Sequence, residues 1–186
     1  MTINCKSTSN INPDSNSPYY LRQATLKDAG EIHSIIDTCY QALEHKEYFI
    51  CDDLDYVRYI LSGNGFGVVA CDANGKIVGN LLVKYPGLKE ENLGYDVGFT
   101  PDNLSRVLHM DSASVLPGHR GHGLESKMIA FAETLVDTSK YCYSFATVAP
   151  ENYASLKSLK RNGYTVMTTK EKYEGLIRCV MMKELK

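Results

Sequence analysis

Val115-Leu116-Pro117-Gly118-His119-Arg120-Gly121-His122-Gly123-Leu124 is the stretch that decides how this chain is interpreted. An apolar, strand-like run ends here at a glycine-rich turn, and an amphipathic helix follows at once. The N–H groups of a helix's first turn have no intrahelical partner and carry the positive end of the helix dipole, so they attract anions. Glycines let the backbone come close to such a ligand. The stretch therefore predicts a cradle for phosphate groups.

The bulk composition is that of an ordinary globular domain. The chain has 186 residues with 44% hydrophobic and 23% charged residues, and its formal net charge is −2. This length fits one domain. The charge gives no basic surface for nucleic acid, and no apolar run approaches the ~20 residues that span a bilayer. The six cysteines form no C-x-x-C pair and no signal peptide precedes them, so we expect free thiols in the cytoplasm.

Residue patterns predict the order of helices and strands. Residues 1–18 are rich in Ser, Asn, Thr and Pro and predict a flexible tail, which leaves residues 19–186 as the domain. Asn74-Gly75 predicts a tight hairpin between two strands, and Thr25 or Asp28 and then Asp52 or Asp53 are candidate helix caps. Strands are expected at 19–24, 66–71, 76–85, 106–116, 141–148, 164–169 and 176–182, and helices near 29–43, 54–63, 121–137 and 151–161.

This order predicts an α+β fold, with a central mixed β-sheet flanked by helices in a single domain. Residues 86–103 carry few regular signals and are expected to form a long loop. Tyr95 and Asp96 in that loop are either ordinary polar loop residues or contacts for an amine substrate.

Two motifs resemble one known family. The order of elements and the run Val115-x-Pro117-x-x-Arg120-Gly121-x-Gly123-Leu124 resemble the GNAT superfamily of acetyl-CoA-dependent N-acyltransferases. Asn152-x-x-Ser155-Leu156, followed by Asn162-Gly163-Tyr164, resembles the helix and glycine-aromatic ending that follow the next strand in that family. A single glycine-rich turn is weak evidence, but two signatures at this separation are much stronger.

Two other phosphate-binding motifs do not fit. A P-loop needs Lys followed by Ser or Thr after its last glycine, and a dinucleotide fingerprint needs a third glycine. Glu125 and Ser126 follow Gly123 instead.

The resemblance implies acetyl-CoA as acyl donor and assigns its contacts. The pyrophosphate would lie on backbone N–H groups of residues 118–123, and the Val115 N–H would lie near the thioester carbonyl. Ser126 would add a hydroxyl, and Asn152 and Ser155 would line the other side of the pantetheine arm. The cofactor-binding residues expected are Val115, Pro117, Gly118, His119, Arg120, Gly121, His122, Gly123, Leu124, Ser126, Asn152 and Ser155.

The chain departs from the family pattern at three positions. Gly118 stands where the motif often has Gln or Arg, and Glu125 stands where many relatives have glycine. Leu159 stands where many members have the tyrosine that protonates the leaving thiolate, so Tyr153 or solvent would have to serve.

His109 and Asp111 are the candidate catalytic residues. Side chains two apart on a strand share a face, so these two are expected on one face with Ala113 and Val115. Either could remove a proton from the attacking amine at neutral pH. Ordinary polar sheet residues are the equal alternative. No metal site is expected, because His119 and His122 lack a third ligand.

The resemblance implies an N-acetyltransferase that moves an acetyl group from acetyl-CoA to a primary amine of a small molecule or peptide, by direct attack in a ternary complex. The alternative, which the Leu159 departure leaves open, is a non-catalytic acyl-CoA-binding sensor or structural module. No nucleic-acid or membrane partner is expected. The oligomeric state is left open, with a homodimer among the states that the sequence permits.

Overall fold

A mixed sheet organises the chain. The computed structural model describes residues 17–186, so residues 1–16 of the expected tail lie outside the described part. Within the described part the strands form one seven-stranded sheet in the order β1-β2-β3-β4-β5-β7-β6. Only β4 and β5 pair parallel there, as a mixed sheet requires. The strands are β1 (Tyr20–Gln23), β2 (Gly65–Cys71), β3 (Ile77–Lys84), β4 (Val107–Val115), β5 (Tyr143–Val148), β6 (Thr165–Lys172) and β7 (Leu176–Glu184).

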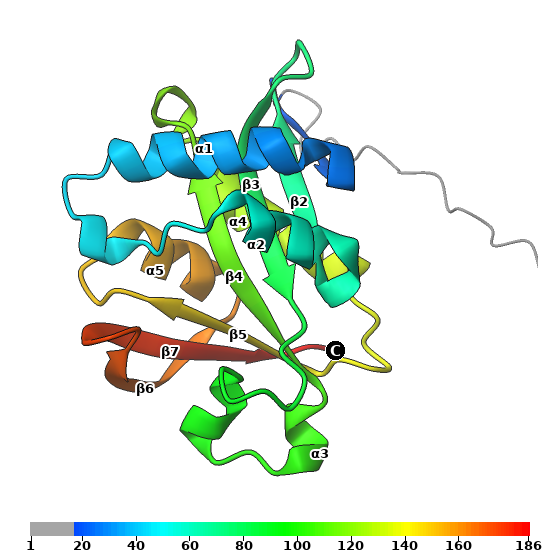
Figure 1. Cartoon of the computed structure of the whole chain (residues 1–186), viewed down its shortest axis with the longest axis vertical. Coiled ribbons are helices and arrows are strands. Elements are labelled where there is room, and N and C mark those ends of the chain that lie inside the picture. Colours follow the sequence, from blue (N-terminus) through cyan, green and yellow to red (C-terminus); the bar gives the residue numbers. More distant parts are fainter. Residues whose placement is uncertain (1–16) are drawn as a thin grey trace, which may run out of the picture.

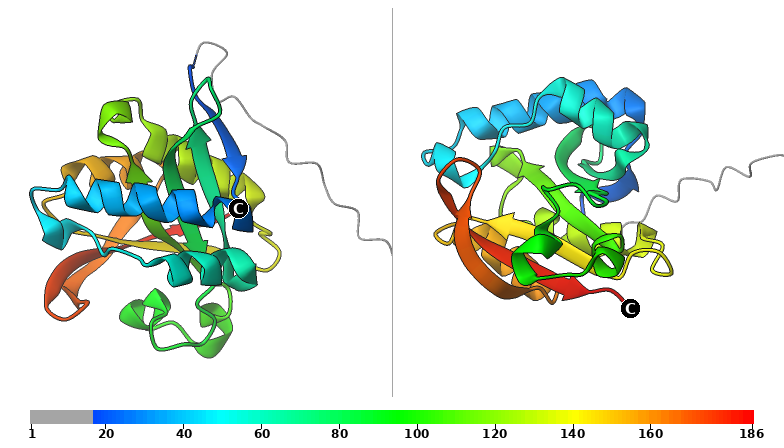
Figure 2. Two further views of the ribbon diagram at one scale, coloured as in Figure 1. Left: turned by 45° about the horizontal axis from the view of Figure 1, so that its top comes forward. Right: turned by 60° about the horizontal axis from the view of Figure 1, so that its bottom comes forward.

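Helices cover both faces of this sheet. On one face lie α1 (Ala29–Gln41) and α2 (Leu54–Tyr59), and on the other lie α4 (Leu124–Leu135) and α5 (Tyr153–Arg161), as Figure 1 and the two turned views of Figure 2 show. Each pair of helices buries its own apolar cluster against the sheet. The α+β fold predicted from the sequence is confirmed. No helix in residues 17–186 is long and apolar enough to cross a bilayer.

The apolar stripe predicted for α4 packs as expected. Leu124, Met128, Phe131 and Ala132 are buried in the cluster on that face, and Leu135 packs against its edge. The start of this helix is later than predicted: α4 begins at Leu124 instead of residue 121 or 122, because the two glycines before it adopt a left-handed backbone.

The segment 86–103 is more regular than predicted. It contains a short 3-10 turn at Leu93–Val97 and, at its end, the short helix α3 (Pro101–Leu104). Asn92 is the reason for the first turn, since its Oδ1 accepts the Gly94 N–H at 2.9 Å and its Nδ2 donates to the Leu104 carbonyl at 3.0 Å. Pro101 at the first helical position suits the second element.

Strand β4 carries one residue more than β3 can pair. Leu82 pairs with Ser112 and Val83 pairs with Met110, which leaves Asp111 between them as a bulge. A bulge bends its strand and changes which side chains face which side beyond it. The structure therefore reorders the faces of β4 at Asp111.

The expectation that His109, Asp111, Ala113 and Val115 share one face is wrong for this reason. Beyond the bulge, Ala113 and Val115 pack on the α4 side together with Met110, which precedes the bulge. His109 and Asp111 lie on the opposite face, toward α2 and the 86–104 segment.

Strands β4 and β5 separate soon after they meet. Their parallel pairing covers only residues 107–109 and 143–145, and Figure 1 shows the two strands diverging from that point. The backbone edges beyond the paired residues are not used by the sheet, so a space opens between the strands.

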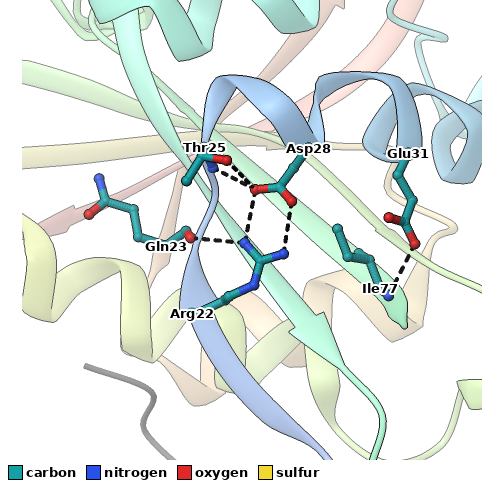
Figure 3. A network of polar contacts seen from close by, with 6 residues as sticks. All are labelled: Arg22, Gln23, Thr25, Asp28, Glu31 and Ile77. Carbon is teal, nitrogen blue, oxygen red and sulfur yellow. Dashed lines mark hydrogen bonds and ion pairs between the residues drawn. The ribbon is translucent and has the colours of Figure 1, made fainter. Parts of the chain in front are cut away.

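A carboxylate fixes the entry to α1 (Figure 3). Asp28 accepts hydrogen bonds from the Thr25 N–H at 2.7 Å and from both terminal nitrogens of Arg22 at 2.9 and 2.8 Å. The Arg22 guanidinium is the main cause that lowers the pKa of Asp28 to about 2. One turn further on, Glu31 accepts the Ile77 N–H at 3.2 Å and so ties α1 to β3.

We predict that Asp28→Asn destabilises the protein by about 1 kcal/mol at pH 7, because the Arg22 guanidinium loses its anionic partner. Because the folded-state pKa lies below the ordinary value of about 3.9, this contribution is present above pH 4 and is lost as the pH falls toward 2. Urea unfolding of both proteins at pH 7 and pH 3 measures it. Asp55→Asn, at an exposed i,i+3 ion pair, is the control and should change stability by less than about 0.5 kcal/mol. An equal loss at both pH values for Asp28→Asn contradicts the prediction.

Candidate active site

The space between β4 and β5 is part of a cavity of about 980 Å³. Its walls come from both strands, from the N-terminal half of α4, from the length of α5, from the end of α1, and from Tyr48 and Phe49 ahead of α2. Pro117, Gly118 and His109 do not line it. The residues singled out in the sequence that do line it are Asp111, Val115, His119, Arg120, Gly121, His122, Gly123, Leu124, Ser126, Asn152 and Ser155.

The glycine turn shapes one end of this cavity. Gly121 and Gly123 have φ values of 84° and 68°, which side chains other than glycine adopt at a cost. Helix α4 starts without a side-chain cap, and its first intrahelical bond runs from the Lys127 N–H to the Gly123 carbonyl. The N–H groups of residues 124–126 thus have no intrahelical partner and stand at the cavity wall, as an anion cradle requires.

The backbone of Val115 is directed toward the gap between the strands. Its neighbour Leu116 donates its N–H to the Val78 carbonyl of β3 at 2.9 Å. Hydrogen-bonded and non-bonded pairs alternate in an antiparallel ladder, so the Val115 N–H and carbonyl point away from β3. The carbonyl accepts the Arg120 Nε at 3.1 Å, which folds the arginine back along the strand and leaves the N–H directed toward β5.

The two histidines of the turn pack on an aromatic ring. The Tyr19 hydroxyl lies 3.0 Å from His119 Nδ1, and the Tyr19 ring centroid lies 5.3 Å from that of His122. No group of three possible metal ligands occurs in residues 17–186. The turn is therefore built around Tyr19.

Glu125 is directed across the cavity to α5. Its Oε1 accepts the Ser155 hydroxyl at 2.6 Å, and burial raises the pKa of its carboxyl. Asn152 caps α5 by accepting the Ser155 N–H at 3.2 Å. Asn152 and Ser155 thus shape the wall opposite the cradle, and the raised pKa makes Glu125 easier to neutralise next to an anionic ligand.

Hydrogen bonds from Asn162 join the α5 wall to the α4 wall. Asn162 Nδ2 donates to the Ser126 hydroxyl oxygen at 2.9 Å and to its carbonyl at 3.1 Å. Leu159 is buried and lines the cavity, so an apolar side chain occupies the wall position that the resemblance assigns to tyrosine. Tyr153 is 76% exposed and lies outside the lining.

Asp111 brings a carboxylate to the same cavity. Its Oδ2 accepts the Tyr56 hydroxyl at 2.6 Å. Desolvation by the surrounding protein raises the pKa of this carboxyl, although the Tyr56 hydrogen bond and the Lys84 ammonium act in the opposite direction. A carboxylate that takes up a proton more readily than usual suits proton abstraction.

His109 does not reach the cavity. The imidazole is 4% exposed, and its Nε2 accepts the Leu93 N–H at 3.1 Å. Burial lowers the pKa of His109 to about 3, with a further contribution from the Lys84 ammonium. The neutral ring instead holds the 86–104 segment on β4.

Three residues that sequence reasoning missed stand near Asp111. Tyr56 comes from α2, and Asp52, just before that helix, has its pKa raised to about 7 by burial and by the Asp111 charge. Tyr173, in the turn between β6 and β7, places its hydroxyl 3.0 Å from Thr147 Oγ1 on the cavity wall. Of these three residues, only Asp52 carried a signal in the sequence, as a candidate helix cap.

Asp96 serves the fold. It accepts hydrogen bonds from Lys170 at 2.9 Å and Lys172 at 2.7 Å, while the Tyr95 hydroxyl donates to the Leu88 carbonyl at 3.0 Å. The segment 86–104 is thereby tied to β6, in agreement with the ordinary polar role that the sequence allowed.

A sequence model of the acetyltransferase (GNAT) family matches residues 29–164. The chain belongs to this family. The match covers the motif turn, the cavity walls and the helix-and-glycine signature, so the resemblance read from the sequence is confirmed. No match is found among curated protein sequences.

Solved structures share the GNAT fold at low sequence identity. The ribosomal-protein-S5-alanine acetyltransferase of Vibrio fischeri superposes with a TM-score of 0.68 at 15% identity, over 96% of this chain and 97% of that one. A GNAT phosphinothricin acetyltransferase of Sinorhizobium meliloti, in complex with acetyl-CoA, gives 0.67 at 15% identity over 91% and 89%. The yncA protein of Salmonella typhimurium, solved with its cofactor acetyl-CoA, gives 0.67 at 17% identity over 91% and 95%. GNAT enzymes use acetyl-CoA as their donor.

We predict that Gly121→Ala weakens acetyl-CoA binding about tenfold. A non-glycine residue held at φ 84° costs about 1–2 kcal/mol, and a tenfold change in affinity corresponds to about 1.4 kcal/mol. Acetyl-CoA-induced thermal stabilisation and calorimetric titration measure the change. Gly118→Ala is the matched control, because this glycine has no positive φ and open space at its Cβ position. Equal affinities for both variants would remove the turn from the binding site.

We predict that His109→Leu lowers the free energy of unfolding by about 1–3 kcal/mol at pH 7, because the buried Leu93 N–H loses its acceptor. A folded-state pKa of about 3 against about 6.5 unfolded means that wild-type stability falls as the pH drops from 6.5. The variant lacks this contribution, so its unfolding in urea changes less between pH 7 and pH 5.

Acetyl-CoA-induced stabilisation should survive in His109→Leu. The control is His45→Leu, whose imidazole is 55% exposed and whose loss should change stability by less than about 0.5 kcal/mol. A stable His109→Leu protein with no affinity for acetyl-CoA would return His109 to the site.

Proposed function

We propose that this protein transfers the acetyl group of acetyl-CoA to a primary amine, with donor and acceptor bound together and the amine attacking the thioester directly. One observation carries the proposal: a single cavity extends from the unpaired N–H groups at the start of α4 to the carboxylate of Asp111. An anion site and a proton acceptor therefore open into the same space.

The donor end is assigned to the cradle. The first turn of α4, residues 124–126, offers its N–H groups and the positive end of the α4 dipole to the pyrophosphate of acetyl-CoA. The Val115 N–H, which points toward β5, is the donor for the thioester oxygen as negative charge develops there. Asn152 and Ser155 line the opposite wall, along the pantetheine arm.

Asp111 is assigned the acceptor end. An amine must be neutral to attack, and the Asp111 carboxylate takes its proton while the Tyr56 hydroxyl holds that carboxylate in place. His109 is not the base, because its imidazole is buried and its Nε2 accepts the Leu93 N–H.

The leaving thiolate takes its proton from water in this proposal. Leu159 provides no acidic group at the wall, and Tyr153 lies outside the cavity lining. The same observation favours a second candidate function, an acyl-CoA-binding module without turnover. Release of free thiol separates the two candidates.

We predict that acetyl-CoA raises the melting temperature and that free thiol accumulates with at least one member of a panel of primary amines. Asp111→Asn should lower kcat/KM by at least about 100-fold, the usual contribution of a general base, and keep the acetyl-CoA affinity. The wild-type rate should rise with pH through a pKa above that of an ordinary carboxyl, since only the charged form accepts the proton. Asp55→Asn is the control with wild-type kinetics. Stabilisation by acetyl-CoA without thiol release from any amine would select the non-catalytic candidate.

A further inference from the structure

Two adjacent aspartates precede α2, and the helix uses one of them. Asp53 caps α2, its Oδ1 accepting the Tyr56 N–H at 2.7 Å. The neighbouring Asp52 is partly buried, and its Oδ2 has no hydrogen-bond partner among residues 17–186. A buried carboxylate oxygen without a partner costs free energy. Helix capping does not explain why Asp52 is placed there.

A second unpartnered polar group faces Asp52. Ser112, next to the bulge in β4, is 6% exposed, and within residues 17–186 its hydroxyl has no hydrogen-bond partner of normal geometry. It lies close enough to Asp52 to lower that carboxyl's pKa, against the larger effect of burial. A partly buried carboxyl and a buried hydroxyl from different elements thus lie close together, while Asp52 Oδ2 and Ser112 Oγ have no hydrogen bond of normal geometry within residues 17–186.

Asp111 connects this place to the cavity. One of its carboxylate oxygens accepts the Tyr56 hydroxyl, and the other has no partner in the described part of the chain. Burial and the nearby carboxylate raise the pKa of Tyr56, so this hydroxyl keeps its proton and acts as a donor. The free oxygen of Asp111 is available to a ligand that enters through the cavity.

The charges around the two carboxyls favour a cation. The Lys84 ammonium is paired with Glu91 at 2.9 Å, and the His109 ring is neutral at physiological pH. Burial raises the pKa of Tyr173, with a smaller contribution from the charge of Asp111, so that side chain stays neutral. Titratable groups that interact with the pair come from several elements: Lys84 of β3, Cys51, Asp53 and Tyr56 around the start of α2, Glu91 of the 86–104 segment and Tyr173 of the β6–β7 turn.

We propose that Asp52 and Asp111 form one carboxyl pair that binds the acceptor as an ammonium ion. This makes alkylamines the acceptor class and excludes arylamines, because arylamines are neutral at physiological pH. This assignment rests on the proposed function. Asp111 lines the cavity and touches the ammonium. Asp52 does not line it and is a positioning residue, whose charge holds the cation against Asp111. The side chain of Ser112, a residue of β4, lies next to Asp52.

The transfer balances with this pair. The ammonium gives one proton to Asp111, and its freed lone pair forms the new C–N bond to the acetyl carbon. The C–S bond breaks with its electrons on sulfur, and the CoA thiolate takes a proton from water. The new amide nitrogen loses its second proton to solvent, so ammonium and acetyl-CoA give amide, CoA thiol and one released proton.

Binding can be tested without turnover by NMR titration of the full chain with benzylamine hydrochloride and with benzyl alcohol, which has similar shape but no charge. We expect benzylamine alone to shift the backbone amides of Tyr56 and Ser112. Asp52→Asn should weaken this binding at least tenfold, and Asp55→Asn, at an exposed carboxyl of the same helix, should not. Retained stabilisation by acetyl-CoA verifies that Asp52→Asn is folded.

Turnover is tested with acetyl-CoA and either benzylamine or aniline. Benzylamine should be acetylated at least tenfold faster, and Asp52→Asn should shift the pH dependence of kcat/KM, which a purely structural role would not do. The carboxyl pair is overturned if benzyl alcohol binds as well as benzylamine, if aniline is acetylated faster, or if Asp52→Asn leaves benzylamine binding unchanged. In each of these cases, thiol release still upholds the proposed function. Ammonium-selective binding without thiol release supports the pair and rejects the transfer.

Discussion

The short pairing of β4 with β5 is the constraint on which the rest of this structure depends. Only three residues of each strand are joined, and the bulge at Asp111 follows immediately on β4. Strands that stayed paired would satisfy each other's N–H and carbonyl groups and leave no space between them. Their separation frees the backbone of Val115 and makes room for the cavity. The cradle and the carboxylate face one space because Asp111 lies on β4 and the cradle at the start of α4 follows the end of that strand.

The donor side could be predicted from the sequence because its geometry is local. Gly121 and Gly123 sit directly before a helix, and a left-handed backbone followed by an uncapped first turn gives unpaired N–H groups whatever the rest of the chain does. The hairpin at Asn74-Gly75 was predictable for the same reason, and Gly75 has a φ of 84°. The apolar stripe of α4 likewise follows from spacing within one helix.

The acceptor side depends on contacts that no local pattern encodes. The bulge at Asp111 reflects how β3 and β4 align, and it overturned the prediction that His109 and Val115 share a face. His109 looked suited to proton transfer by residue type, yet burial and the Leu93 N–H make it a neutral structural group. Tyr56 reaches Asp111 across 55 residues of sequence. Such pairings follow from packing of the whole domain.

Glu125 bears on how long a cofactor stays bound. Its carboxyl stands at the wall of the cradle and is held there by the Ser155 hydroxyl. In the proposed site, acetyl-CoA and spent CoA present the same phosphates to this wall, so repulsion by a charged Glu125 acts on substrate and product alike and changes neither the barrier nor the equilibrium of the reaction. The repulsion shortens the residence time of acetyl-CoA and of CoA. Since product release limits turnover in many enzymes, this carboxyl favours rapid exchange of CoA over tight retention.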